Sequence, residues 1–215
     1  NASDPADNFE QNSSTLVTGE SAVFSDFTVK TDGKEEAVAD SLVSVKSSDS
    51  SVVSVDKTNP KKIVAQAPGT ATITLSYGGK TKTVTVTVTN TKRELKEAKI
   101  LDSKGNVLNS ISIVKKDGVA KTGVISGVVY DQYGDPISKA VTIKAENDTI
   151  ANFTTDTDAA ADGKSVSKTS DKDGIFSATI DALKAGYTVI TFYDAAGNKL
   201  TTSPFQVKVT ANADL

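Results

Sequence analysis

Residues 69–89, GTATITLSYGGKTKTVTVTVT, constrain the fold more than any other stretch of this chain. Apolar and polar side chains alternate strictly through both halves, and a period of two predicts two β-strands. A Gly-Gly pair separates the halves, and glycine accepts the positive φ that both central positions of a type I′ turn require. We therefore expect a β-hairpin with a two-residue turn.

The register of this hairpin follows from its composition. If Tyr77 and Lys80 flank a two-residue turn, the apolar residues of both strands share one face and the threonines share the other. A three-residue loop would instead place valines opposite threonines. The apolar face needs a second sheet to cover it, which predicts a β-sandwich. The predicted opposed pairs are Ile73 with Val84, Ala71 with Val86, Thr74 with Thr83, and Thr72 with Thr85.

The composition removes most catalytic chemistry, because the chain has no Cys, Met, Trp or His. Without histidine it lacks the usual general base and the His-containing triads. Without cysteine it lacks disulfides, thiol nucleophiles and thiolate zinc sites. The acids fall mainly in turn-like segments, without the orienting partners that a catalytic site needs. We therefore expect that the chain is not an enzyme.

The charge and hydropathy of the chain limit its partners. The formal net charge is −3 and the pI is about 5.1, so the chain lacks the basic footprint of a nucleic-acid-binding protein. No apolar run is long enough for a transmembrane helix, and no signal peptide is apparent. The chain begins with Asn rather than Met. We expect a mature product or an excised fragment, from which a secretion signal could have been removed.

The order of turn signals predicts four segments. Residues 1–13 are polar and predict a linker. Residues 14–90 contain about seven short strands, which suits a small sandwich; one is expected over 21–30, and the segment 38–46 is expected to supply Leu42 and Val43 to the core. Residues 91–99 form a charged connector in which an Arg93–Glu97 pair at i,i+4 favours either one or two helical turns or a stiff extended bridge. Residues 100–215 predict a second sandwich with one long polar loop and a strand over 140–145 that points Val141 and Ile143 inward.

Two segments of the first predicted sandwich resemble a known family. They are SSDSSVVSVD at 47–56 and KKIVAQAPGTATITLSYGG at 61–79, followed by a Val/Thr strand. A Ser/Asp-rich turn, a VxSV strand and an IxAxxxGTATIT-like signature are together similar to bacterial immunoglobulin-like domains of group 2. The resemblance covers residues 47–88.

The second predicted sandwich resembles bacterial immunoglobulin-like domains of group 1 and the related invasin-type repeats. The resemblance covers residues 124–209, where a DxxGxP turn and a TDxDG-like turn each precede a strand, with Ser170 in place of the Thr. Together the two resemblances imply an all-β fold of two tandem immunoglobulin-like β-sandwich domains. The two turns correspond to Asp131, Gly134 and Pro136, and to Asp171, Asp173 and Gly174.

Leu183, Gly186 and Tyr187 indicate a tyrosine corner in the second sandwich. In such a corner a tyrosine hydroxyl bonds to the backbone a few residues upstream. Two further tyrosines, Tyr130 and Tyr133, lie beside a loop and suit either stacking on a sugar or a place at the edge of the core.

The loop at 156–174, DTDAAADGKSVSKTSDKDG, contains the weak candidates for a calcium site. Calcium prefers six to eight hard oxygen ligands, and alternating aspartates that end in Asp-Gly can supply them. However, the spacing is not that of an EF-hand, lysines lie among the acids, and Asx turns explain Asp before Gly without a metal. Both interpretations stay open, and no cofactor is required. The candidates are Asp156, Asp158, Asp162, Asp171 and Asp173.

The composition and the tandem modules resemble the self-assembling surface-layer (S-layer) proteins of Gram-positive bacilli. This resemblance implies an extracellular structural module in a two-dimensional lattice on the bacterial cell surface, often dependent on calcium. Its partners would be copies of itself and neighbouring immunoglobulin-like domains. No surface-layer-homology motif is present to assign wall anchoring. The alternatives are the stalk of an adhesin of the invasin or intimin type, and an accessory module of a secreted polysaccharide enzyme, because a fold does not dictate a function.

Overall fold

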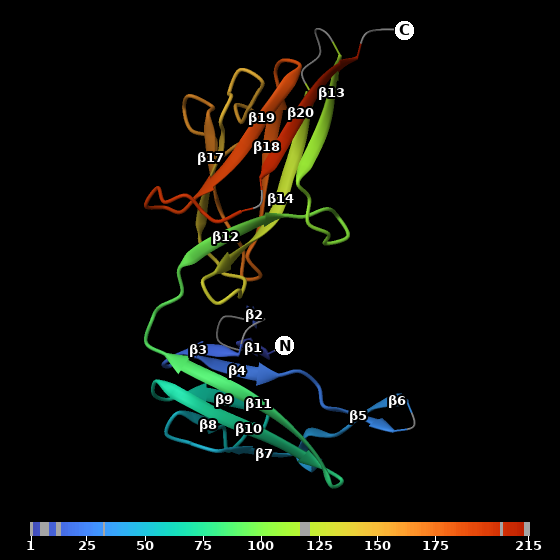
Figure 1. Ribbon diagram of the computed structural model, residues 1–215, viewed down its shortest axis with the longest axis vertical. Helices are drawn as coiled ribbons and strands as arrows, with labels where there is room; N and C mark the ends of the chain where they lie inside the picture. The colour runs from blue at the N-terminus through green and yellow to red at the C-terminus, as the bar shows by residue number, and fades with distance from the viewer. Residues whose placement is uncertain are drawn as a thin grey trace. The chain divides into compact units, whose positions relative to one another are not determined.

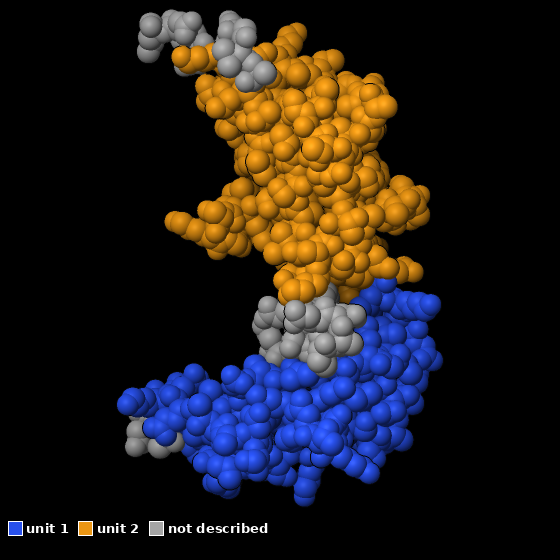
Figure 2. Space-filling view, turned by 180° about the vertical axis from the view of Figure 1, so that it is seen from behind, with its two compact units in different colours: residues 1–93, 133–135 blue, residues 94–132, 136–215 orange. Residues whose placement is uncertain are grey.

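The computed structural model divides the chain into two compact units, coloured separately in Figure 2. Unit 1 comprises Asn1–Arg93 and Tyr133–Asp135, and unit 2 comprises Glu94–Gln132 and Pro136–Leu215. Each unit has its own apolar core and is built almost entirely of strands. The predicted all-β sandwich fold is therefore confirmed. The structure describes residues 2–4, 9–11, 14–31, 33–116, 121–202 and 204–212.

Unit 1 contains two sheets and a separate two-stranded ribbon (Figure 1). The first sheet has the order β2-β1-β4-β9-β8, formed by Phe9–Gln11, Ala2–Asp4, Ser21–Phe24, Lys62–Ala65 and Val53–Val55. The second has the order β3-β11-β10-β7, formed by Thr15–Val17, Lys80–Thr89, Gly69–Tyr77 and Ser44–Ser47. The ribbon pairs β5 (Thr28–Thr31) with β6 (Lys34–Ala37). Strands β1 and β2 lie within the segment that the sequence predicts as a linker.

The hairpin of β10 and β11 has the predicted register. Ile73 lies opposite Val84 and Thr74 lies opposite Thr83, and the two turn glycines have φ of 55° and 76°. The inward face packs against the first sheet, and burial of this face provides the hydrophobic stabilisation of unit 1. The buried core residues are Leu16, Ala22, Val53, Ile63, Ala65, Ala71, Ile73, Val86 and Val88.

Two local predictions for unit 1 are wrong. The sequence predicts one strand over residues 21–30, but the chain forms β4 and β5 with residues 25–27 between them. The sequence also places Leu42 in the core, whereas its side chain is 61% exposed. Leu42 ends a short 3₁₀ helix, Asp40–Leu42, which turns it outward and leaves Val43 to pack inward.

We predict that Gly78→Val lowers the free energy of unfolding by about 2 kcal/mol, because a β-branched residue resists positive φ. A Cβ at this position would meet no atom within 4 Å, so the cost comes from the backbone conformation alone. Thermal denaturation measures the effect. The matched control is Gly78→Asn, since asparagine tolerates positive φ and should leave the melting temperature close to that of the original chain. Equal melting temperatures for the Val and Asn variants would contradict the turn assignment.

Unit 2 is a second sandwich of two sheets (Figure 1). One has the order β12-β14-β18-β16, formed by Leu95–Ile100, Lys121–Asp131, Ile175–Ala182 and Ala151–Asn152. The other has the order β13-β20-β19-β15-β17, formed by Ser110–Lys116, Phe205–Asn212, Gly186–Tyr193, Ala140–Ala145 and Ser165–Thr169. Strand β12 begins inside the segment that the sequence predicts as a charged connector.

The core of unit 2 is larger and contains phenylalanines from both sheets and from the loop after β16. Phe176 and Phe192 meet edge to face with ring centroids 5.9 Å apart, the favoured geometry for an aromatic pair. Val141 and Ile143 point inward, as predicted. No helix in the described part of the chain has the length and apolar character needed to cross a membrane.

The predicted tyrosine corner is wrong. Tyr187 is 56% exposed, and its ring lies 5.6 Å from the ammonium nitrogen of Lys208. Tyr187 pairs with Lys208 across β19 and β20, so both side chains stand on the outer face of the sheet. This position keeps the hydroxyl in solvent.

Candidate functional site in the acidic loop

Asp156 is the most buried of the five candidate aspartates, with a side chain that is 3% exposed. It lies in the loop between β16 and β17. Its carboxylate accepts hydrogen bonds from the backbone N–H of Asp158, at 2.9 Å, and of Thr179 on β18, at 2.7 Å. The bond from Thr179 attaches the acidic loop to the neighbouring sheet.

Lys168 supplies the positive charge of this site. Its ammonium nitrogen lies 2.7 Å from a carboxylate oxygen of Asp156 and 2.5 Å from one of Asp158. Lys168 belongs to β17, and its side chain is 16% exposed. Two carboxylates therefore share one cation that the chain itself provides.

These contacts shift the pKa of both partners. Burial opposes the ionisation of Asp156, but hydrogen bonds from Lys168 and from the backbone outweigh it, so the pKa of Asp156 lies below its ordinary value of 3.8. Burial likewise opposes the charge on Lys168, but bonds to Asp156 and Asp158 outweigh it and raise its pKa above 10.5. The pair therefore stabilises the fold fully between these two ordinary values. Its contribution is lost as the pH falls through the lowered Asp156 pKa or rises through the raised Lys168 pKa.

The other three candidates do not join this pair. Asp162 accepts a hydrogen bond from the backbone two residues on, as in an Asx turn. Asp171 accepts bonds from the backbone N–H groups of Asp173 and Ile175 and so closes the turn before β18. Asp173 pairs with its neighbour Lys172 at 3.0 Å. In the described part of the chain, no group of three or more acidic side chains is placed to hold a metal ion.

Asp181 belongs to the same region, although the sequence does not single it out. It is buried on β18 and accepts hydrogen bonds from the backbone N–H and the hydroxyl of Thr155, at 2.8 and 2.5 Å. A lone carboxylate within the apolar run ATIDAL is the signal that could have indicated a buried partner. Asp181 and Thr179 together fix the acidic loop against β18.

We predict that Lys168→Met lowers the free energy of unfolding by about 1.5 kcal/mol at neutral pH, because it leaves Asp156 buried without its cation. The cost is smaller than for a fully buried pair, since solvent reaches Asp158. Thermal denaturation across pH tests the pair directly. The deficit should shrink as the pH falls through the Asp156 pKa, because protonation of Asp156 removes the unpaired charge from the variant and the ion pair from the original chain.

The matched control is Lys164→Met. Lys164 pairs with Asp148 at 3.0 Å, but its side chain is 55% exposed. Exposed pairs contribute little, so this variant should melt within a degree or two of the original chain. Equal effects of the two substitutions, or a Lys168→Met deficit that does not depend on pH, would contradict the role of Asp156.

Arg93 connects several parts of unit 1. It pairs with Glu20 at 2.9 Å and with Asp135 at 2.7 Å, and it donates to the backbone oxygen of Thr15. The predicted pair with Glu97 is wrong, because Glu97 lies on β12 and pairs with Lys99. In an extended strand, residues four apart do not meet as they do on a helix.

The two loop tyrosines both lie beside cations. The ring centroid of Tyr133 is 5.6 Å from the Arg93 guanidinium, and its hydroxyl donates to the backbone oxygen of Thr91. The ring centroid of Tyr130 is 4.8 Å from the ammonium nitrogen of Lys99. Cation–π contacts of this kind stabilise partly exposed rings.

We predict that Arg93→Met lowers the free energy of unfolding by about 3 kcal/mol, because it removes the guanidinium from the buried carboxylate of Asp135. The Asp135 side chain is fully buried. Chemical denaturation measures the loss. Adding Asp135→Asn to Arg93→Met should recover part of it, since the buried negative charge is then removed; a double variant less stable than Arg93→Met would argue against this explanation.

No protein-family model matches the chain. A curated relative, the S-layer protein EA1 of Bacillus anthracis, is 30% identical over 202 residues. The predicted resemblance to S-layer proteins is confirmed. The alignment spans 94% of this chain but only 21% of the length of the S-layer relative.

Solved structures of S-layer and adhesin proteins are also similar to the chain. Domains 4 and 5 of the S-layer protein SbsC share 20% identity, cover 98% of this chain and 99% of their own, and give a TM-score of 0.43. Domains 4–9 of SbsC share 19% identity over 100% of this chain and 30% of that one, with a TM-score of 0.45. Invasin, a bacterial integrin-binding protein, shares 17% identity. The match covers 91% of this chain and 36% of the invasin chain, with a TM-score of 0.38.

Proposed function

We propose that this chain is a structural module of an S-layer protein and takes part in a two-dimensional lattice on the outside of a bacterial cell. The observation that carries the proposal is the 30% identity to EA1 over nearly the whole chain. The role is mechanical rather than catalytic. The module holds its place through contacts with neighbouring domains of the same protein and with other copies.

The outer face of the β10–β11 hairpin suits such contacts. Four consecutive opposed pairs on this face consist only of threonine and serine. Charged residues are depleted at the centres of protein interfaces, and this face carries hydroxyl groups instead. Such a surface supports weak association through hydrogen bonds and water. The pairs are Thr70 with Thr87, Thr72 with Thr85, Thr74 with Thr83, and Ser76 with Thr81.

The lattice proposal predicts that the purified chain associates weakly with itself. We expect its sedimentation coefficient to rise between about 10 µM and about 1 mM, the range in which contacts of modest free energy are populated. Thr72→Glu combined with Thr83→Glu should weaken this association, because like charges then meet across the interface. The matched control places the same two charges at Ser177 and Thr122, which are exposed on unit 2.

A chain that stays monomeric over the whole range would contradict a lattice contact in this segment. It would favour the stalk of an adhesin, the alternative that the sequence leaves open. Association that is equally weakened by both pairs of substitutions would place the contact elsewhere than on the hydroxyl face.

Calcium remains a prediction from the sequence, and we propose Asp156 and Asp158 as its first ligands. The support for this proposal is that one cation, the Lys168 ammonium, already reaches both carboxylates. Removing it with Lys168→Ala should therefore make the melting temperature more sensitive to millimolar calcium. If calcium shifts neither the original chain nor the variant, the acidic loop does not bind this metal.

A further inference from the structure

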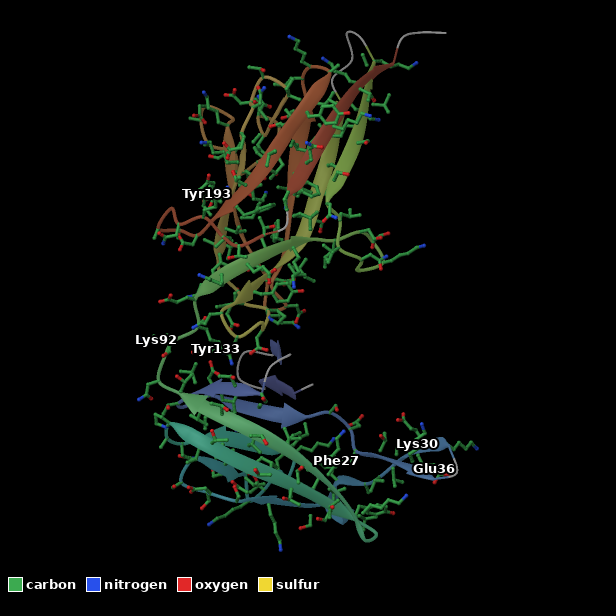
Figure 3. All side chains as sticks on the ribbon, in the orientation of Figure 1. Phe27, Lys30, Glu36, Lys92, Tyr133 and Tyr193 are labelled. Atoms are coloured by element: carbon green, nitrogen blue, oxygen red, sulfur yellow. The ribbon has the colours of Figure 1, made fainter. Side chains whose placement is uncertain are left out.

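A groove of about 680 Å³ opens inside unit 1. It lies at the end of the sandwich, where the β10–β11 hairpin runs on to its turn while β4 ends at Phe24. The segment that follows β4, including Phe27 and Val29, forms another wall of the groove. Figure 3 labels Phe27 at the base of the β5–β6 ribbon, and Lys30 on the ribbon itself.

The floor of the groove is apolar. Four of its lining residues, Leu16, Ala22, Ile63 and Val86, belong to the buried core of unit 1. Half-buried apolar side chains from the hairpin and from the 24–29 segment continue this lining toward solvent. Ligand sites of comparable volume are typically apolar clefts with a few polar groups at fixed places.

The mouth of the groove is basic. The inward face of β11 carries valine at 88, 86 and 84 but changes to lysine at 82 and 80. Lys82 stands opposite Leu75, on the same face as the core valines, and both residues line the groove. The face of one strand therefore changes from apolar to cationic along the length of the groove.

The charges of Lys80 and Lys82 at this mouth are not neutralised within the described residues. Lys80 donates to the backbone oxygen of Lys30, and neither Lys80 nor Lys82 forms an ion pair with a described residue, whereas Lys30 stands opposite Glu35 on β6. The one acidic residue of the lining, Asp26, is already bonded to Lys61 at 2.7 Å. The groove thus has a positively charged rim above an apolar floor, although the whole chain has a net charge of −3.

We propose that this groove binds a fatty acid. The acyl chain lies on the apolar floor, where it removes both itself and the groove lining from water. The carboxylate stays at the mouth, where the ammonium groups of Lys82 and Lys80 attract it. Apolar lining and cationic rim together match an anionic amphiphile better than a neutral sugar or a second protein strand. This proposal does not depend on lattice formation.

The test is isothermal titration of the 215-residue chain with dodecanoate below its micelle concentration. We expect saturable binding of one molecule per chain. Dodecyltrimethylammonium has an acyl-like chain of the same length and the opposite charge, so it should bind roughly tenfold more weakly. If dodecanoate shows no saturable binding, or if the two amphiphiles bind equally well, the proposal is overturned.

Charge reversal locates the site. Lys82→Glu combined with Lys80→Glu should weaken dodecanoate binding roughly tenfold or more. Both side chains are exposed, so the fold should tolerate the change. The matched control is Lys46→Glu: Lys46 lies opposite Thr74, on the outer face of the same sheet, and its reversal should leave binding unchanged.

Two further outcomes would reject the proposal. Equal binding by the double variant and the Lys46→Glu control would show that the rim does not recognise the carboxylate. If the groove instead seats a second copy of the chain, the double variant should lose self-association in sedimentation experiments while dodecanoate neither binds nor competes.

Discussion

The fold of unit 1 depends on burial of the inward face of the β10–β11 hairpin. Strict alternation puts all apolar side chains of both strands on that face, and a glycine pair fixes the register that keeps them together. Exposure of this apolar face to water is unfavourable, so the first sheet packs against it. A one-residue slip would expose the valines and bury the threonines. The hydroxyl face outside and the groove at the hairpin tip both follow from this single register.

The hairpin could be predicted because its determinants are local. Alternation, turn residues and register all lie within residues 69–89, so no distant partner had to be known. The contacts of Arg93 could not be predicted in this way, since Glu20 and Asp135 lie 73 and 42 residues away in sequence. A helical i,i+4 pair was the nearest local explanation, and it fails because β12 is extended. The prediction of a tyrosine corner at Tyr187 failed for a related reason, since only the pairing of β19 with β20 reveals which face of the sheet Tyr187 occupies.

The acidic loop illustrates a limit of composition. Five aspartates in one segment predict either a metal site or a series of turns, and the spacing alone does not choose between them. The three-dimensional arrangement divides the aspartates by the partners that they bond. Asp171 and Asp162 bond to the backbone of their own turns, whereas Asp156 and Asp158 converge on Lys168. A lysine twelve residues away supplies the charge that a divalent ion would otherwise bring, so a metal at this site has to compete with an ammonium already held by two carboxylates.

The groove leaves apolar surface exposed, just as the acidic loop leaves carboxylates that need a cation. A hairpin longer than the sheet that covers it leaves an apolar surface at its tip, and water makes such a surface unfavourable unless something covers it. Lysines at 82 and 80 end the valine series at that point, and their long apolar stems can cover part of the exposed lining. Lysines that only cover apolar surface with their stems could do so on either face of the hairpin, with no groove beneath them. Their position over an apolar floor, without carboxylate partners among the described residues, is what distinguishes a binding rim from a protected edge.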